Sequence, residues 1–320
     1  MYIIIYILTK HLYIPLCYQY YMKRKVVKLG PSTLVVSLPS KWIKSQKIEA
    51  GNELEMTEAE GTLVLNSGDK KKEKKEITVE ITDENRHNLL HILTHVYRAG
   101  YAKITIKGDN LSDEVKNITK DILLGFEVTN RGNESCIIEN VAEPTEDKYE
   151  TMLRRAFLIT KETQEKLIEL FEGKKVNKED FDDLKKQHDR FVVFCRRIIF
   201  QKGNKEDILR WELLTNQMQL QHAHYYLFKY VDNNGFDKDK NIAELLMGLQ
   251  TYYDLLYEGC FKKDVEKLHK LHKEKDKYQY GRCFELLNSK KNAVVYSYIR
   301  EMFRLTQCGS SPLLSLFLSY

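Results

Sequence analysis

The sequence predicts a multidomain, mixed fold: a small β-rich domain, a small α+β module and a long all-α region. Three patterns support this. Short apolar runs rich in β-branched residues alternate with turn residues at 22–72, strand-like and helix-like segments alternate at 73–142, and apolar residues recur every three or four positions at 143–320. A chain of 320 residues is long enough for two or three domains.

Residues 1–21, MYIIIYILTKHLYIPLCYQYY, do not fit the sequence that follows them. The apolar run from Tyr2 to Leu8 is too short to span a bilayer, and no small-residue cleavage site closes it. We therefore expect no stable membrane insertion, and we interpret Met22 as the start of the protein and residues 1–21 as translated upstream sequence. A peripheral membrane anchor is the alternative.

Residues 22–72 predict a strand, a Gly30-Pro31-Ser32 turn, a second strand, one short helix and two more strands. The helix would follow Pro39, with Ser40 as its N-cap and Trp42 and Ile43 as buried anchors. Its apolar residues are more numerous than so small a piece can bury, so a second copy is the natural partner.

Basic residues crowd the same region. Between Met22 and Gly51 there are seven lysines and arginines against one glutamate, a net charge of +6. A solvated lysine-rich face would explain any single one, but their clustering around one strand pair and one helix favours a surface that contacts phosphates. The candidate DNA-binding residues are Lys23, Arg24, Lys25, Lys28, Ser32, Thr33, Lys41 and Lys44.

The stretch KVVKLGPSTLVVSLPSKWIKSQKIEAGNELEM, residues 25–56, resembles the swapped-hairpin DNA-binding domain of the AbrB, SpoVT and MazE families. The shared features are a basic strand, a G-x-S/T turn, a V-x-L-P run, a short helix with tryptophan and a glycine turn before an acidic strand. The resemblance implies an intertwined homodimer in which hairpins from two chains complete one β-barrel, with basic strand residues and loops facing DNA.

The charged segment SGDKKKEKKE at 67–76 is typical of a linker between domains. Beyond it, residues 73–142 predict the order βαβαββ, a small α+β module with helices on one face of its sheet. His87, His91 and His95 recur every fourth residue on the first helix of this module. This spacing could align metal ligands, but a polar, partly exposed stripe is the commoner explanation.

Residues 143–320 predict six long helices, three on each side of a break at Asp232–Gly235, followed by a short apolar tail from Leu313 to Leu318. A weak internal repeat at an offset of 87 residues, which matches Phe181 to Leu268, supports this division. The short loops favour two antiparallel three-helix bundles side by side.

The helical region resembles the PhoU phosphate-uptake regulator family through LRRAFLITKETQEKLIELFEGK, DFDDLKKQHDRFVVFCRRI and YIREMFRLTQCGSSPLLSLFL. With the α+β module between them, residues 22–320 look like the archaeal-type regulators that join an AbrB-like domain to a PhoU-like domain of tandem three-helix bundles. This resemblance implies a dimeric DNA-binding transcriptional regulator linked to phosphate uptake.

One departure from the family concerns metal. The family's third helix commonly carries carboxylates that bind iron or zinc clusters, but here the segment reads MQLQHAHYYL, with Gln219 and Ala223 at the acidic positions and only His224 retained. Amide and methyl groups cannot replace carboxylates as ligands of hard metals. We therefore expect no metal and no other cofactor. A residual site stays open, because His269, His272 and Asp276 share one helix face and His222 and His224 lie in another helix.

No catalytic motif is present: the sequence lacks a P-loop, a G-x-G-x-x-G after a strand, H-E-x-x-H and G-x-S-x-G, so we expect no enzyme. Six scattered cysteines without a C-x-x-C pair fit a reducing cytoplasm. The alternative function is a phosphate-signalling adaptor that binds a transporter or kinase through its PhoU-like half without direct DNA binding. An antitoxin would explain the hairpin domain but not the helical half.

Overall fold

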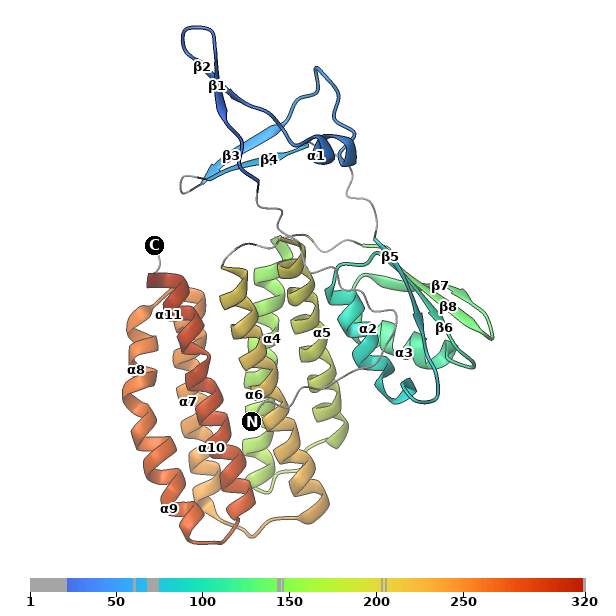
Figure 1. Ribbon diagram of the computed structural model, residues 1–320. Coiled ribbons are helices and arrows are strands. Elements are labelled where there is room, and N and C mark those ends of the chain that lie inside the picture. Colours follow the sequence, from blue (N-terminus) through green and yellow to red (C-terminus); the bar gives the residue numbers. More distant parts are fainter. Residues whose placement is uncertain are drawn as a thin grey trace, which may run out of the picture. The chain divides into compact units, whose positions relative to one another are not determined.

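The computed structural model describes residues 22–59, 62–67, 75–142, 145, 147–202, 204 and 206–318 (Figure 1). The chain forms two compact units, Met1–Glu73 and Lys74–Tyr320, each of which is described by itself. The first unit is β-rich with small sheets, and the second is largely helical. The predicted mixed fold is confirmed at this level, whereas the interpretation of residues 1–21 lies outside the described residues.

The first unit consists of two antiparallel hairpins and one short helix. In chain order its elements are β1 (Val26–Leu29), β2 (Thr33–Val36), α1 (Ser40–Ser45), β3 (Glu55–Ala59) and β4 (Thr62–Asn66). Gly30 begins the turn between β1 and β2 with φ of 78°, a value that glycine adopts without the steric cost of a side chain. The Oγ of Ser67 donates a 3.1 Å hydrogen bond to Gln46, so the chain just after β4 is joined to the end of α1.

Helix α1 begins one residue earlier than predicted. Pro39 is the N-cap, with extended backbone angles, and Ser40 is already the first helical residue, so the expectation that Ser40 caps the helix was wrong. Proline suits the start of a helix because the backbone N–H that it lacks would have no acceptor there. Its carbonyl oxygen accepts the first helical hydrogen bond, from the N–H of Ile43 at 2.9 Å. Trp42 and Ile43 are only half-buried within this single chain.

The second unit begins with a four-stranded sheet in the order β5-β6-β8-β7, in which β5 and β6 are parallel and the other neighbours are antiparallel. The predicted order βαβαββ is confirmed. These elements are β5 (Glu76–Glu80), the 3₁₀ turn Arg86–Asn88, α2 (Leu89–Arg98), β6 (Lys103–Lys107), α3 (Ser112–Ile122), β7 (Phe126–Arg131) and β8 (Ser135–Asn140).

One face of this sheet is buried and the other is polar. Ile104 and Ile106 on β6 and Ile138 on β8 are fully buried in a core shared with α2 and α3. Residues of β6 and β8 that alternate with them point the other way, where Lys103 pairs with Glu139 at 3.5 Å. The helices therefore cover a single apolar face.

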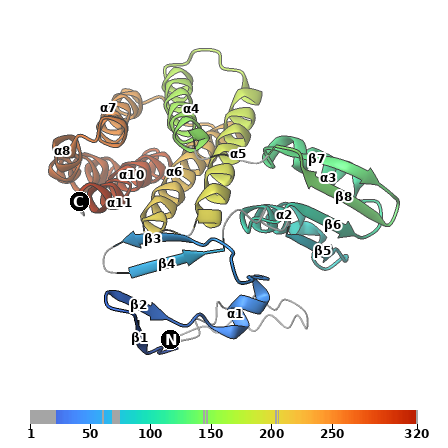
Figure 2. The ribbon, with the colours of Figure 1, turned by 90° about the horizontal axis from the view of Figure 1, so that it is seen from above.

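The rest of the second unit is helical (Figures 1 and 2). Its elements are α4 (Asp147–Phe171), α5 (Lys178–Lys202), α6 (Asp207–Asn234), α7 (Lys240–Lys262), α8 (Val265–Lys275), a π-helical segment (Asp276–Arg282), α9 (Cys283–Asn288), α10 (Ala293–Cys308) and α11 (Ser310–Leu318). Helices α4, α5 and α6 contact one another, as do α7, α8 and α10. Contacts of α4 with α7 and of α6 with α10 join the two sets around one hydrophobic core.

The C-terminal part differs from the prediction in two places. Three long helices were expected after the break at Asp232–Gly235, but the second of them is divided into α8 and α9 by the π-helical turns at Asp276–Arg282. Lys263, just before α8, adopts a left-handed conformation with φ of 53°. The apolar tail expected at Leu313–Leu318 belongs to a helix, α11, which begins at Ser310. Pro312 lies in its first turn, where a missing backbone N–H costs nothing, and Leu313 is buried.

The α+β module and the helical bundle, which the sequence divides at 142/143, belong to the same compact unit. Helix α5 contacts both α2 and α3, and Val193 on α5 is part of the core of the module. Sequence periodicity predicts each part separately, but their joint core depends on a helix that serves both.

Candidate functional site

All eight predicted DNA-binding residues are exposed and lie in the first unit. Three precede β1, one is on it, one is in the hairpin turn, one begins β2 and two are on α1; they are Lys23, Arg24, Lys25, Lys28, Ser32, Thr33, Lys41 and Lys44. The first hairpin therefore has cations just before and on its first strand, and hydroxyl groups in its turn and at the start of β2. Helix α1 has no acidic residue in its first turn, and Lys44 lies in its last turn.

The strand register decides what surrounds the cation on β1. Lys28 pairs with Leu34, and Val26 pairs with Val36, so these four side chains share one face of the hairpin. The other face carries Val27, Leu29, Thr33 and Val35, which also pair across the strands. Both faces of the hairpin are thus mainly apolar, and Lys28 is the one charged residue between Val26 and Val36.

Within the single chain these apolar side chains are open to solvent. The exposed fraction is 69% for Leu34, 64% for Leu29, 63% for Val26 and 57% for Val27. Covering a valine or leucine side chain completely contributes about 1.5–3 kcal/mol. A two-stranded hairpin is at best marginally stable alone, and in the described part of this chain neither of its faces is covered.

The same unit has an apolar groove of about 680 Å³ beside α1. Its walls are formed by Met22, Leu38, Pro39, Trp42 and Leu65, with Lys41 and Ser45 at the edge. The groove joins residues from before β1, from α1 and from β4, so it depends on the fold of the whole unit. It is a second surface of this unit that one copy leaves uncovered.

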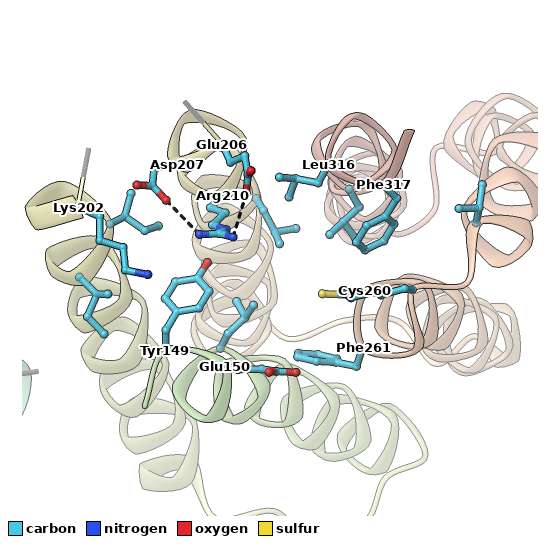
Figure 3. A pocket seen from close by; sticks show the side chains of 17 residues that line it. Tyr149, Glu150, Lys202, Glu206, Asp207, Arg210, Cys260, Phe261, Leu316 and Phe317 are labelled. Carbon is cyan, nitrogen blue, oxygen red and sulfur yellow. Dashed lines mark hydrogen bonds and ion pairs between the residues drawn. The ribbon is translucent and has the colours of Figure 1, made fainter. Parts of the chain in front are cut away.

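A separate cavity of about 670 Å³ lies in the second unit, at one end of the helical bundle (Figure 3). It is lined by the start of α4, the end of α5, the start of α6, the end of α7 and by α11. Arg210 occupies its centre, where it pairs with Asp207 at 3.2 Å and with Glu206 at 3.2 Å. No sequence motif marks these residues, because they come from segments far apart in the chain.

The metal-site candidates do not form a cluster. His87, His91 and His95 are all exposed, and His95 lies 2.6 Å from the guanidinium of Arg98. His272, on α8, lies 3.1 Å from the hydroxyl oxygen of Ser310 and belongs to a different part of the second unit. Among the residues that the structure describes, no group of three or more histidine, cysteine, aspartate or glutamate side chains could hold a metal ion.

The segment that departs from the family pattern carries a polar network instead. His222 lies 2.9 Å from Asp189, which also accepts a 2.7 Å hydrogen bond from Lys185. Burial acts to raise the pKa of Asp189, but its hydrogen bonds and the nearby lysine outweigh burial and hold that pKa well below its usual range. Asp189 is therefore an ionised acceptor on α5 that joins this helix to His222 on α6.

Two histidines of the same helices are fully buried. Burial lowers the pKa of His188, and it lowers the pKa of His224 to about 4. The Nδ1 of His224 lies 2.7 Å from the carbonyl oxygen of Leu220, which the neutral ring can satisfy as a donor. Both imidazoles are therefore neutral at physiological pH.

No family model, no curated protein and no solved structure matches the chain. In the described part of the chain, none of the helices combines the length and the apolar character that crossing a membrane requires.

Proposed function

We propose that this protein is a dimeric, cytoplasmic DNA-binding transcriptional regulator linked to phosphate uptake. The observation that carries the proposal is the first hairpin, which has apolar residues on both faces and cations immediately before and on its first strand. The first feature requires a second copy, and the second provides a surface for a polyanion.

The dimer follows from what the single chain leaves uncovered. A swapped-hairpin arrangement would place the hairpin of one chain against that of its partner and so cover both faces at once. The apolar groove beside Trp42 is a second place where a partner chain could pack. Small domains without disulfides or metals commonly reach stability through such oligomerisation.

DNA binding follows from the doubling of charge. In a two-fold dimer each of the six candidate cations appears twice, and such a concentration of positive charge attracts the phosphate backbone. Phosphate contacts position the protein but carry little sequence information. Specificity would come from Ser32 and Thr33 at the hairpin tip or from the shape and bending of the DNA.

The link to phosphate uptake rests on the resemblance of the helical region to PhoU. The three-plus-three contacts of α4–α6 and of α7, α8 and α10 are consistent with tandem three-helix bundles. The second candidate function is the adaptor, in which this helical half binds a transporter or kinase and the first unit only dimerises. It is supported by the division of the chain into two compact units, because among the described residues the hydrophobic cores of the second unit contain none from the first.

DNA binding by the full chain, titrated with salt, separates the two candidates. Three phosphate contacts per chain give about six per dimer, so log K should fall against log salt with a slope of about −5. The measurement uses a random-sequence duplex and fluorescence anisotropy between about 50 and 200 mM salt. A dimer that shows no salt-dependent binding would contradict the regulator and favour the adaptor.

A further inference from the structure

The cavity at the end of the helical bundle contains a buried hydroxyl group without a partner. The Tyr149 hydroxyl oxygen is shielded from solvent, and none of the residues that the structure describes forms a hydrogen bond with it. Figure 3 shows this hydroxyl directed toward Arg210 in the middle of the cavity. A buried polar group left unpaired costs about 1–3 kcal/mol, so a ligand that satisfies it has a built-in advantage.

The chemistry of this hydroxyl is that of a donor. Burial raises the pKa of Tyr149 far above the physiological range, so the phenol keeps its proton. A protonated phenol in a partly enclosed site is best satisfied by an acceptor such as a carboxylate oxygen. The nearest cation, Arg210, is already committed to Asp207 and Glu206, yet its planar group has five N–H donors, more than these two contacts use.

The charges around the cavity are balanced. Its lining contains three cations, namely Lys202, Arg210 and Lys263, and three carboxylates. One of these carboxylates, Glu150, pairs at 3.8 Å with Arg154, which lies outside the lining. The lining as a whole is neutral, so it does not repel an anion.

The remaining wall is apolar. Leu153 contributes from α4, Phe261 from α7, and Leu316 and Phe317 from α11, and Figure 3 shows Leu316 and Phe317 on the side away from Lys202. The cavity volume of about 670 Å³ is within the usual range for small-molecule sites. The Tyr149 hydroxyl and the Arg210 donors on one side, with an apolar wall on the other, match a ligand that has an acceptor group at one end and an apolar body at the other.

We propose that this cavity is a binding site for a small amphipathic organic anion, a carboxylate with an apolar body. The carboxylate accepts a hydrogen bond from the Tyr149 hydroxyl beside Arg210, and the apolar body lies against Phe261 and α11. The proposal is independent of DNA binding, because every residue in it belongs to the helical bundle of the second unit.

The test uses decanoate as the probe and the full chain at pH 7, with isothermal titration calorimetry below the micelle concentration. We expect one site per chain, and binding at least tenfold tighter for decanoate than for 1-decanol or decyltrimethylammonium. The substitution Tyr149→Phe removes only the hydroxyl and should weaken decanoate binding at least tenfold. It should weaken 1-decanol binding less, because a neutral hydroxyl is a poorer acceptor than a carboxylate. Leu316→Trp should fill the apolar side and abolish binding of both.

The matched control is Tyr226→Phe, because Tyr226 is an exposed tyrosine of α6 and does not line the cavity. It should bind decanoate like the parent. Hydrogen exchange adds the location: decanoate should slow exchange in 310–318 and at the start of α4. Absence of binding, equal affinity for the cationic probe, unchanged binding in both cavity variants, or protection confined to β1 and β2 would each overturn the proposal.

Discussion

The guanidinium of Arg197 on α5 donates a 2.9 Å hydrogen bond to the carbonyl oxygen of Tyr101, between α2 and β6. It also donates to the carbonyl oxygen of Tyr97 and lies over the rings of Tyr97 and Phe126. Arg197 is fully buried. A single side chain of the bundle thus satisfies the backbone where helix α2 of the α+β module ends.

We predict that Arg197→Met lowers the free energy of unfolding by about 2–4 kcal/mol, because it leaves two carbonyl oxygens without this donor. Urea denaturation followed by circular dichroism measures the change. Arg155→Met is the control, since Arg155 is exposed on α4, and it should stay within about 0.5 kcal/mol of the parent. Equal stability of the two variants would show that Arg197 does not stabilise the contact between the helical bundle and the α+β module.

The exposed first hairpin leads to a prediction about assembly. The full chain should sediment as a dimer at micromolar concentration, and Leu34→Ala should weaken the dimer by about 2–5 kcal/mol, or about 25-fold or more in the dissociation constant. Leu90→Ala provides the comparison, because Leu90 is an exposed leucine of α2 in the second unit. A parent chain that sediments as a folded monomer would rule out the dimer.

The buried imidazoles predict a pH dependence of stability. The pKa of His224 is about 4 when folded and about 6.5 when unfolded, so the unfolded chain takes up the proton first. Stability is therefore complete above about pH 6.5 and falls as the pH drops toward 4, by at most about 3 kcal/mol for this group. Burial lowers the pKa of His188 too, which adds a loss in the same direction.

Urea midpoints at pH 7 and pH 4.5 measure this effect. The variant His224→Leu, which cannot take up a proton at this position, should show a smaller difference between the two pH values than the parent. His269→Leu, at an exposed position on α8, should keep the full difference. Asp189 does not add to this difference. Its pKa is depressed in the folded chain, so its contribution to stability is lost only as the pH falls below the usual pKa range of a carboxyl group. If the parent and His224→Leu lose the same stability between pH 7 and pH 4.5, the protonation of His224 is not the cause of the loss.

Sequence patterns predicted the elements that depend on local periodicity. Alternating and three-to-four-residue apolar spacing located the strands of the module and the long helices. Gly173, with φ of 81°, and Asn177 lie between α4 and α5. Asn177 accepts a hydrogen bond from the backbone N–H of Glu179 at 3.3 Å, as expected of a cap. These signals lie within a few residues of the element they define.

What the sequence did not predict depends on packing between distant segments. Helix α11 was interpreted as an apolar tail because five of its last six residues are apolar. A run of this kind has no alternation of apolar and polar residues that would indicate a helix. The π-helical turns at Asp276–Arg282 differ from an α-helix in their backbone hydrogen bonds. The residue types of this segment do not reveal that difference. The cavity could not be found because Tyr149, Arg210 and Phe317 become neighbours only when three helices meet.

The last prediction concerns the basic strand. Lys25 and Lys28 supply two cations in each chain and four in a dimer, so Lys25→Ala with Lys28→Ala should weaken binding to all DNA sequences and flatten the salt slope by about four. The fold should survive, because both side chains are exposed and Lys28 faces Leu34 rather than an acidic partner in the strand register. The control replaces Lys148 and Lys175, two exposed lysines of the second unit, with alanine and should leave the slope unchanged.

The Lys25 and Lys28 double variant loses charge but no apolar surface, so sedimentation should still show a dimer. Any loss of DNA binding then reports on phosphate contacts. A double variant that binds as tightly as the parent at about 150 mM salt would show that this strand is not the DNA surface.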